Sequence, residues 1–201
     1  MAWLSPVFPT GGFAYSAGLE QAVADELVQN EDTLHTWLET LLTRGSFWNE
    51  VVLIAAAHRC EADVAELASA LASSAERYRE TLDQGAAFLD AASAWGGSDL
   101  PRETPLPVAL GVVCQAASIP LIDTLTAALQ TLVSNHLQAA IRLSLIGQTG
   151  AARLLATLEP TILDSAAKAE SSTLDDLGGS AFMADIMSAR HETLEPRIFL
   201  S

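Results

Sequence analysis

Histidine and cysteine are the side chains of this sequence that could bind a transition metal. The chain has four histidines and two cysteines, but the spacings H-x-x-x-H, H-x-H and C-x-x-C do not occur. His58 and Cys60 are two residues apart, so a helix would point them to different faces. His136 lies on an apolar stripe, as a core histidine would. A closed metal site needs converging ligands. The pattern therefore predicts no metal site and no cofactor. His191 and Glu192, which we expect on a mobile tail, are the one pair that could bind a metal transiently.

Groups for nucleophilic or phosphate chemistry are equally scarce. The Gly-x-Ser-x-Gly spacing of a serine nucleophile is absent, and no cysteine–histidine pair has a recognisable context. Asp175 and Asp176 are adjacent carboxylates, but their glycine-rich loop favours a solvated turn. The single lysine, Lys168, excludes a phosphate-binding loop of the Walker type. We therefore predict that the chain is not an enzyme.

The stretch 5–20 is the most distinctive local pattern, because it contains two prolines and three glycines. Each proline favours extended geometry in the residue before it. Gly11 and Gly12 can adopt the positive φ angles that other residues avoid. A helix can begin after them, with Tyr15 and Glu20 held near its start. From the residues alone, we interpret the stretch as a rigid helix entry with buried aromatic side chains.

The composition predicts a single all-α domain over residues 1–201. Half of the residues are hydrophobic but only 6% are aromatic, and alanine and leucine are abundant. No long alternation of β-branched residues suggests an extensive sheet. Apolar residues recur at helical spacing, so we expect a bundle of roughly eight to ten helices with extended N- and C-terminal segments.

Caps and apolar periodicity place the expected helices. The polar run 30–32 should cap a helix that begins near Thr33. Thr149 should cap a later helix, which Pro160 should kink or restart. The other expected helices span 47–60, 64–71, 75–95, 107–117, 120–147 and 180–190, and residues 191–201 should be extended. In the 75–95 helix, the side chains expected to point inward are Tyr78, Leu82, Phe88 and Leu89.

Charge and targeting signals restrict the partners and the location. The chain has 25 acidic and 10 basic residues, for a net charge of −15. This charge disfavours nucleic acid and anionic membranes and favours a basic protein partner. Residues 104–122 are uncharged, but prolines interrupt them, so we interpret them as a buried helix. Two distant cysteines and the lack of a secretory signal pattern predict a cytoplasmic location.

The segment 196–201 combines one arginine with three apolar side chains, Ile198, Phe199 and Leu200. A chain end usually frays unless it is docked, and exposed Phe199 and Leu200 would be unfavourable in isolation. The segment either docks on the core of its own chain or inserts into a partner and becomes ordered on binding. The residues alone leave both interpretations open.

Three stretches of the chain resemble the urease accessory protein F family. They are residues 5–20, 133–148 and 184–201. The second contains Arg142 before an Ile-Gly-Gln turn, and the third contains the runs Arg-His-Glu-Thr and Arg-Ile-Phe. The spacing between the three stretches agrees with the family, so the resemblance covers nearly the whole chain.

The resemblance implies an all-helical, homodimeric, non-enzymatic protein that assists nickel insertion into urease. It implies that the dimer bridges accessory protein D (called H in some organisms) and the GTPase G, and docks on apo-urease. Neither nucleic acid nor a membrane is an implied partner. The partner-binding residues that it implies by position are Pro9, Gly11, Gly12, Tyr15, Gly18, Glu20, Asp185, Arg190, His191, Glu192, Arg197 and Phe199.

Two alternative functions stay open at this point. A GTPase-activating protein would insert Arg190 or Arg197 into the GTPase site to stabilise the transition state. A helical small-molecule-binding module, suggested only by the alanine-rich core, would contain a large closed apolar pocket.

Overall fold

The computed structural model describes residues 3, 8–96 and 99–201, which fold into α-helices joined by loops and short 3-10 turns. No β-strand occurs in these residues, and the predicted all-α class is confirmed. The α-helices are α1 (Leu19–Ala24), α2 (Glu31–Arg44), α3 (Ser46–His58), α4 (Val64–Ala70), α5 (Ala75–Ala92), α6 (Leu106–Ala116), α7 (Leu121–Arg142), α8 (Gln148–Glu170) and α9 (Phe182–His191). The 3-10 turns are Gly12–Ala14, Ser93–Trp95 and Leu174–Asp176.

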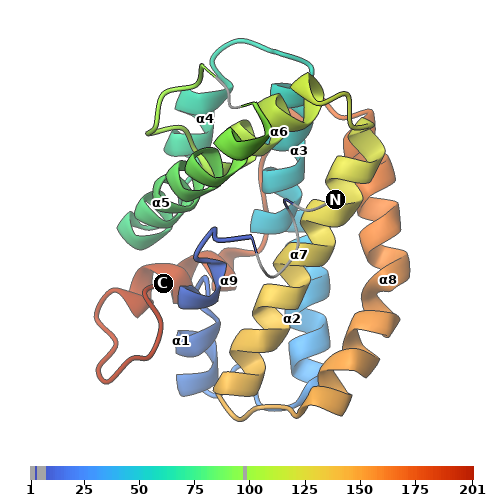
Figure 1. Ribbon diagram of the computed structural model, residues 1–201. Coiled ribbons are helices and arrows are strands. Elements are labelled where there is room, and N and C mark those ends of the chain that lie inside the picture. The colour runs from blue at the N-terminus through green and yellow to red at the C-terminus, as the bar shows by residue number, and fades with distance from the viewer. Residues whose placement is uncertain (1–2, 4–7, 97–98) are drawn as a thin grey trace.

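Helix α3 lies at the centre of the molecule. It packs against α2, α6, α7 and α8, and every residue from 51 to 57 is buried. The long helices α7 and α8 lie side by side, and α5 pairs with α6, which packs along α3 (Figure 1). The short helices α1 and α9 pack against each other beside the C-terminal end of the chain (Figure 1). This arrangement places the stretches near both ends of the sequence together.

The start of α2 is the helix cap that the sequence predicts. The side chain of Asn30 accepts a hydrogen bond from Thr33 N at 3.0 Å, and Thr33 Oγ1 accepts one from Asn30 N at 3.1 Å. This reciprocal pair satisfies backbone N–H groups that the first turn of a helix leaves without partners.

Helices α7 and α8 differ from the sequence-based expectation at their junction. α7 ends at Arg142, because the chain then turns through Ser144 at a φ of 60°. α8 starts at Gln148, so Thr149 lies inside it and is not its cap. Pro160 does not restart α8, which continues to Glu170. Pro160 is on the exposed side of the helix, where water can replace the lost hydrogen bond.

Helix α5 turns a largely polar face inward, in contrast to the apolar face expected. Tyr78 is 45% exposed, and Leu82 and Leu89 are only partly buried, whereas Phe88 is buried as predicted. The other buried residues of α5 are Glu76, Glu80, Thr81, Gln84, Gly85 and Ala92. Buried carboxylates need charged or hydrogen-bonding partners. Those of Glu76 and Glu80 come from the C-terminal part of the chain and from Arg77 of α5 itself.

Helix α6 lies within the uncharged stretch 104–122. It is buried against α3 and α5, as predicted for this stretch. Gly111 allows the close approach, because a Cβ there would lie 2.6 Å from Ile54 O. Among the described residues, no helix combines the length and the apolar character that crossing a membrane requires.

Two cavities within the described residues are small. One of about 50 Å³ lies among Trp3, Phe88 and Leu110, and another of about 60 Å³ lies beside Glu50 and Arg77. Pockets for small molecules usually have about 300 Å³ or more. Neither cavity is therefore the large closed pocket expected of a small-molecule-binding module.

Candidate protein-interaction site at the joined ends of the chain

The predicted motifs near the two ends of the sequence meet where α1 packs on α9. Gly18 lies at this contact, where its backbone φ is 85°. A Cβ on Gly18 would lie 2.7 Å from Ser188 N. Glycine is therefore required both by the positive φ angle and by the close packing of the two helices. We call this region the junction.

The C-terminal segment, residues 192–201, turns back onto the start of the chain. Leu200 N donates a hydrogen bond to Ala14 O at 2.8 Å, and Ser16 N donates one to Ser201 O at 2.7 Å. The Ser16 hydroxyl also donates to Ser201 O, at 2.5 Å. Of the two interpretations that the sequence left open, docking on its own chain is the arrangement in this structure.

Phe199 anchors the C-terminal segment in the core. Its side chain is 2% exposed. Arg142, at the end of α7, places its guanidinium 4.1 Å from the centroid of the Phe199 ring, and its Nη1 donates to Phe13 O. A cation above an aromatic face is attracted by the π electrons of the ring. Helix α7 therefore contacts both end segments through one side chain, Arg142.

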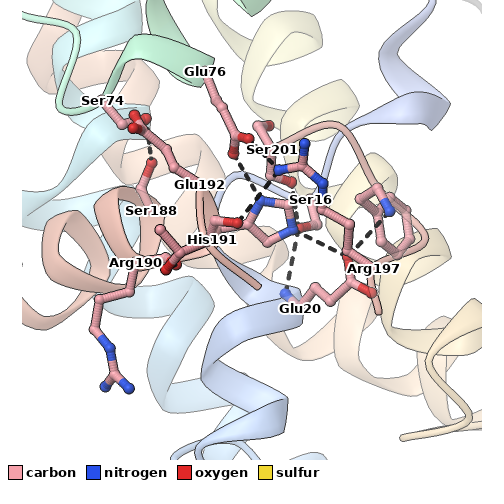
Figure 2. A network of polar contacts seen from close by, with 12 residues as sticks. Ser16, Glu20, Ser74, Glu76, Ser188, Arg190, His191, Glu192, Arg197 and Ser201 are labelled. Carbon is pink, nitrogen blue, oxygen red and sulfur yellow. Dashed lines mark hydrogen bonds and ion pairs between the residues drawn. The ribbon is translucent and has the colours of Figure 1, made fainter. Parts of the chain in front are cut away.

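His191 is completely buried at the junction (Figure 2). Its Nδ1 lies 2.7 Å from Glu76 Oε2, and its Nε2 lies 3.1 Å from Glu20 Oε2. Glu192 instead accepts a hydrogen bond from Ala75 N at 2.7 Å. The expectation that this pair lies on a mobile tail is therefore wrong, because both residues are held by contacts within the chain. No group of three potential metal ligands converges within the described residues.

Glu20 holds the C-terminal segment by its backbone. Its carboxylate oxygens accept hydrogen bonds from Ile198 N at 2.8 Å and from Phe199 N at 3.0 Å. Ser16 Oγ lies 3.3 Å from Glu20 N and supports the start of α1. Hydrogen bonds to an ionised carboxylate are stronger than those between neutral groups. The helix entry predicted from the sequence thus positions one carboxylate for two backbone donors. Its aromatic side chains are not buried as predicted, because Phe13 is 49% exposed and Tyr15 is only partly buried.

Helix α5 supplies two further carboxylates to the junction. Glu76 forms an ion pair with Arg197, and Glu80 accepts a hydrogen bond from Ser201 Oγ at 2.6 Å. Glu80 also forms an ion pair with Arg77. Buried charges are tolerated when opposite charges and hydrogen bonds surround them. The polar inner face of α5 is therefore the binding face for the C-terminal segment.

Comparison with known protein families gives a match over the middle of the chain. The family model described as UreF matches residues 28–159. This chain belongs to the UreF family.

Relatives in the UreF family extend the likeness to both ends of the chain. Urease accessory protein UreF of Brucella ovis is 48% identical over 210 aligned residues, which cover all of this chain and 92% of the relative. The protein of the same name from Mesorhizobium japonicum is 50% identical and covers all of this chain and 94% of its own length. The resemblance inferred from the three stretches is confirmed, and this UreF-family chain is similar to urease accessory proteins over its full length.

Three other predicted residues of this UreF-family chain lie near the start of the junction. Burial raises the pKa of Tyr15, and the neighbouring carboxylate of Asp83 raises it further. Gly11 adopts a φ of 74°, whereas Gly12 lies in the 3-10 turn without a positive φ. Gly12 is instead packed so closely that a Cβ would lie 2.8 Å from Asn135 Nδ2.

Three further predicted residues lie outside the buried network of the UreF junction. Arg190 forms an ion pair with Asp25 at the end of α1. Asp185 is on the exposed side of α9, where partial burial raises its pKa and Arg77 lowers it. Pro9 is exposed. The structure thus brings together Gly18, Glu20, His191, Glu192, Arg197 and Phe199, and leaves these three at the surface.

Sequence reasoning did not identify four residues of the UreF junction: Ser16, Glu76, Glu80 and Ser201. A signal for two of them was present. Glu76 and Glu80 are four residues apart, and Phe88 follows eight residues later, so all three share one face of α5. Acidic residues in line with a core aromatic residue indicate a buried polar contact.

Helix α9 of this UreF-family chain also carries exposed apolar side chains. Phe182 is 67% exposed, and Met183 and Ile186 are about half exposed. An open groove of about 520 Å³ lies between α9 and α2, where Leu27 and Trp37 line it. Grouped apolar side chains on a surface are typical of protein interaction sites. The groove lies at the start of α9, and His191 of the junction lies at the end of the same helix.

Proposed function

We propose that this chain is a non-catalytic urease accessory protein that bridges other maturation factors. In this proposal, a cytoplasmic homodimer binds accessory protein D or H and the GTPase G, and the assembly docks on apo-urease. The dimer couples GTP-dependent steps of its partner to nickel insertion, with nickel as the cargo of the assembly. Membership of the UreF family supports the role in urease maturation.

The proposal rests on one observation: the docked C-terminal segment exposes apolar side chains while it is held in place by the junction. Phe199 is buried, whereas its neighbours Ile198 and Leu200 are more than half exposed. Phe182 and Met183, at the start of α9, are further exposed apolar side chains and line the groove beside α2. A surface that is already ordered loses little conformational entropy when a partner binds. This favours a protein partner, and we assign the D- or H-type protein to it.

The predicted partner-binding residues divide into two roles in this proposal. Gly18, Glu20 and His191 shape the surface from inside, since they are buried and occupied by contacts within the chain. Asp185 and Arg190 are exposed on α9, and we propose that they contact the partner directly. Substitution of the first set should act through the shape of the surface, and substitution of the second set should act locally.

A pair of matched variants tests the proposed surface. Met183 on α9 and Leu163 on α8 are each 50% exposed, so an aspartate at either position meets water equally well. We expect Met183→Asp to weaken capture of the D- or H-type protein at least about tenfold, as for a central interface residue. Leu163→Asp should leave capture unchanged. Equal capture by both variants, with unchanged circular dichroism and thermal unfolding, would contradict the proposal.

GTPase activation is the second candidate, favoured by one observation. The Arg190 side chain is 56% exposed at the end of α9, so it could reach into a bound GTPase. Arg197 is less suited to this role, because it is held by the buried carboxylate of Glu76. The rate of GTP turnover separates this candidate from the bridging role.

A further inference from the structure

Both ring nitrogens of His191 face carboxylate oxygens. Nδ1 lies 2.7 Å from Glu76 Oε2, and Nε2 lies 3.1 Å from Glu20 Oε2 (Figure 2). Each contact is a hydrogen bond only if a hydrogen lies between the two atoms. A neutral imidazole has one ring hydrogen, and ionised carboxylates have none. The three groups therefore share two hydrogens, one more than a neutral histidine between two carboxylates would supply.

The surroundings of His191 give this extra proton a structural role. The ring is completely buried, so water cannot replace a lost hydrogen bond without opening the junction. The charged groups that face the ring or its two carboxylates are Glu20 from α1, Glu76 from α5 and Arg197 from the C-terminal segment. The neighbouring charged groups have other partners: Glu80 pairs with Arg77, Arg190 with Asp25, and Glu192 with Ala75 N.

We propose that His191 is a proton-dependent clamp that holds residues 192–201 on the body of the protein, and that loss of the shared proton releases this segment. Without the proton, the lone pair of one ring nitrogen faces a buried carboxylate, and a hydrogen bond becomes a repulsion. Glu20 transmits the change, because the oxygen that meets His191 Nε2 also accepts the hydrogen bond from Phe199 N.

The direction of the pH dependence follows from which state binds the proton. The docked segment holds the extra proton between two carboxylates, whereas the released segment exposes the ring to water. Docking is therefore strongest when the proton is present and weakens as the pH rises. The consequence for partner binding rests on the proposed function: release of the segment would displace Ile198 and Leu200 from the apolar surface. The clamp itself does not depend on any partner.

Hydrogen exchange of backbone amides tests the clamp directly. The amides of Ile198 and Phe199 are bonded to Glu20 and should exchange only when the segment opens. Measured from about pH 6 to about pH 9, their protection factors, each relative to the intrinsic rate at that pH, should fall as the pH rises. One proton allows a fall of up to about tenfold per pH unit. Amides in α7 should keep their protection, and nitrogen NMR should show hydrogens on both ring nitrogens of His191 while the segment is docked.

Glu76→Gln is the decisive variant, because it removes the need for the extra proton. The amide oxygen of the glutamine can accept from Arg197, and its NH₂ group can donate to Nδ1 of a neutral ring. The remaining ring hydrogen, on Nε2, still reaches Glu20. We expect protection of the segment in this variant to vary by less than about twofold per pH unit. His35→Gln, on α2 outside the junction, should keep the pH dependence of the wild-type protein.

Three results would overturn the clamp: constant protection of the wild-type segment across this range, a single ring hydrogen on docked His191, or the same pH dependence in Glu76→Gln as in the wild-type protein. Capture of the D- or H-type protein is a separate readout. If capture by the wild-type protein and by Glu76→Gln responds equally to pH, the regulatory consequence is wrong, whatever the amides show.

Discussion

Glu20 and Phe199 are 179 residues apart in the chain, yet Phe199 N donates a hydrogen bond to Glu20 Oε2 at 3.0 Å. The same carboxylate oxygen meets His191, whose other ring nitrogen meets Glu76 on α5. One buried group therefore links the start of the chain to α9, α5 and the C-terminal segment. The apolar surface beside His191 therefore depends on how these buried groups are arranged.

Two glycine substitutions should separate close packing from backbone conformation. Gly18 and Gly11 both have positive φ angles, but a Cβ would collide with Ser188 only at Gly18, since no atom lies within 4 Å of one at Gly11. We expect Gly11→Ala to lower the free energy of unfolding by about 1 kcal/mol, from backbone strain alone. Gly18→Ala should cost more than about 2 kcal/mol, because α1 must also move away from α9. Urea denaturation measures the free energy of unfolding of both variants. Equal losses would show that the close packing of α1 on α9 adds nothing to the cost of the substitution at Gly18.

Arg142 should stabilise the docked C-terminal segment through two contacts. Arg142→Gln removes the cation above Phe199 and the hydrogen bond to Phe13 O. We expect the free energy of unfolding to fall by about 1–2 kcal/mol and the protection of the Phe199 amide to fall with it. Arg153→Gln, which breaks an exposed ion pair with Glu31, is the control and should change neither. Unchanged protection in Arg142→Gln would show that Arg142 does not hold the C-terminal segment in place.

His136 should make the protein sensitive to acid. Burial lowers its pKa from 6.5 to about 4, so the unfolded chain takes up a proton before the folded one does. Stability that is fully present above pH 6.5 is then lost as the pH falls towards 4, by about 2–3 kcal/mol at pH 4.5. Urea denaturation at pH 7 and pH 4.5 should show this loss in the wild-type protein and a smaller one in His136→Leu.

The wild-type protein must be compared with His136→Leu because Glu50 stabilises the folded protein in acid, whereas His136 destabilises it. Burial raises the pKa of Glu50 to about 7, so the folded chain gains stability relative to the unfolded one as this carboxyl takes up its proton. This contribution is present in both proteins and cancels in their difference. A pH dependence that is identical in the wild-type protein and in His136→Leu would show that His136 takes up its proton at the same pH in the folded and unfolded chains.

Arg190 tests the choice between bridging and GTPase activation. Arg190→Ala breaks only the surface ion pair with Asp25, so the junction should stay intact. We expect GTP turnover by the complete complex with the GTPase to stay within about twofold of the wild-type rate. A fall of about 10³-fold or more would identify an arginine finger and overturn the bridging role as the main function. Arg197→Ala is less decisive, since it also leaves Glu76 with one partner fewer.

Contacts between residues close together in the sequence were predictable, and contacts between distant residues were not. The cap formed by Asn30 and Thr33 was predictable, because its two residues are three apart and any helix start would bring them together. Tyr78 was expected to point inward because its ring is apolar, but it is exposed. The inner face of α5 instead carries Glu76, whose partners His191 and Arg197 lie more than a hundred residues away in the chain. His191 was expected to be mobile for the same reason: nothing near it in the sequence indicates Glu20 or Glu76.

The sequence by itself determined that this protein is helical, that it lacks the spacings of known catalytic and metal motifs, and that it belongs with the UreF family. Those properties depend on residue types and on separations of a few positions, which local geometry converts directly into structure. Only the tertiary structure decided that Glu20, Glu76 and His191 share one buried site and that Phe199 is an anchor. Contacts across more than a hundred residues depend on how the helices pack, and no local pattern specifies that packing.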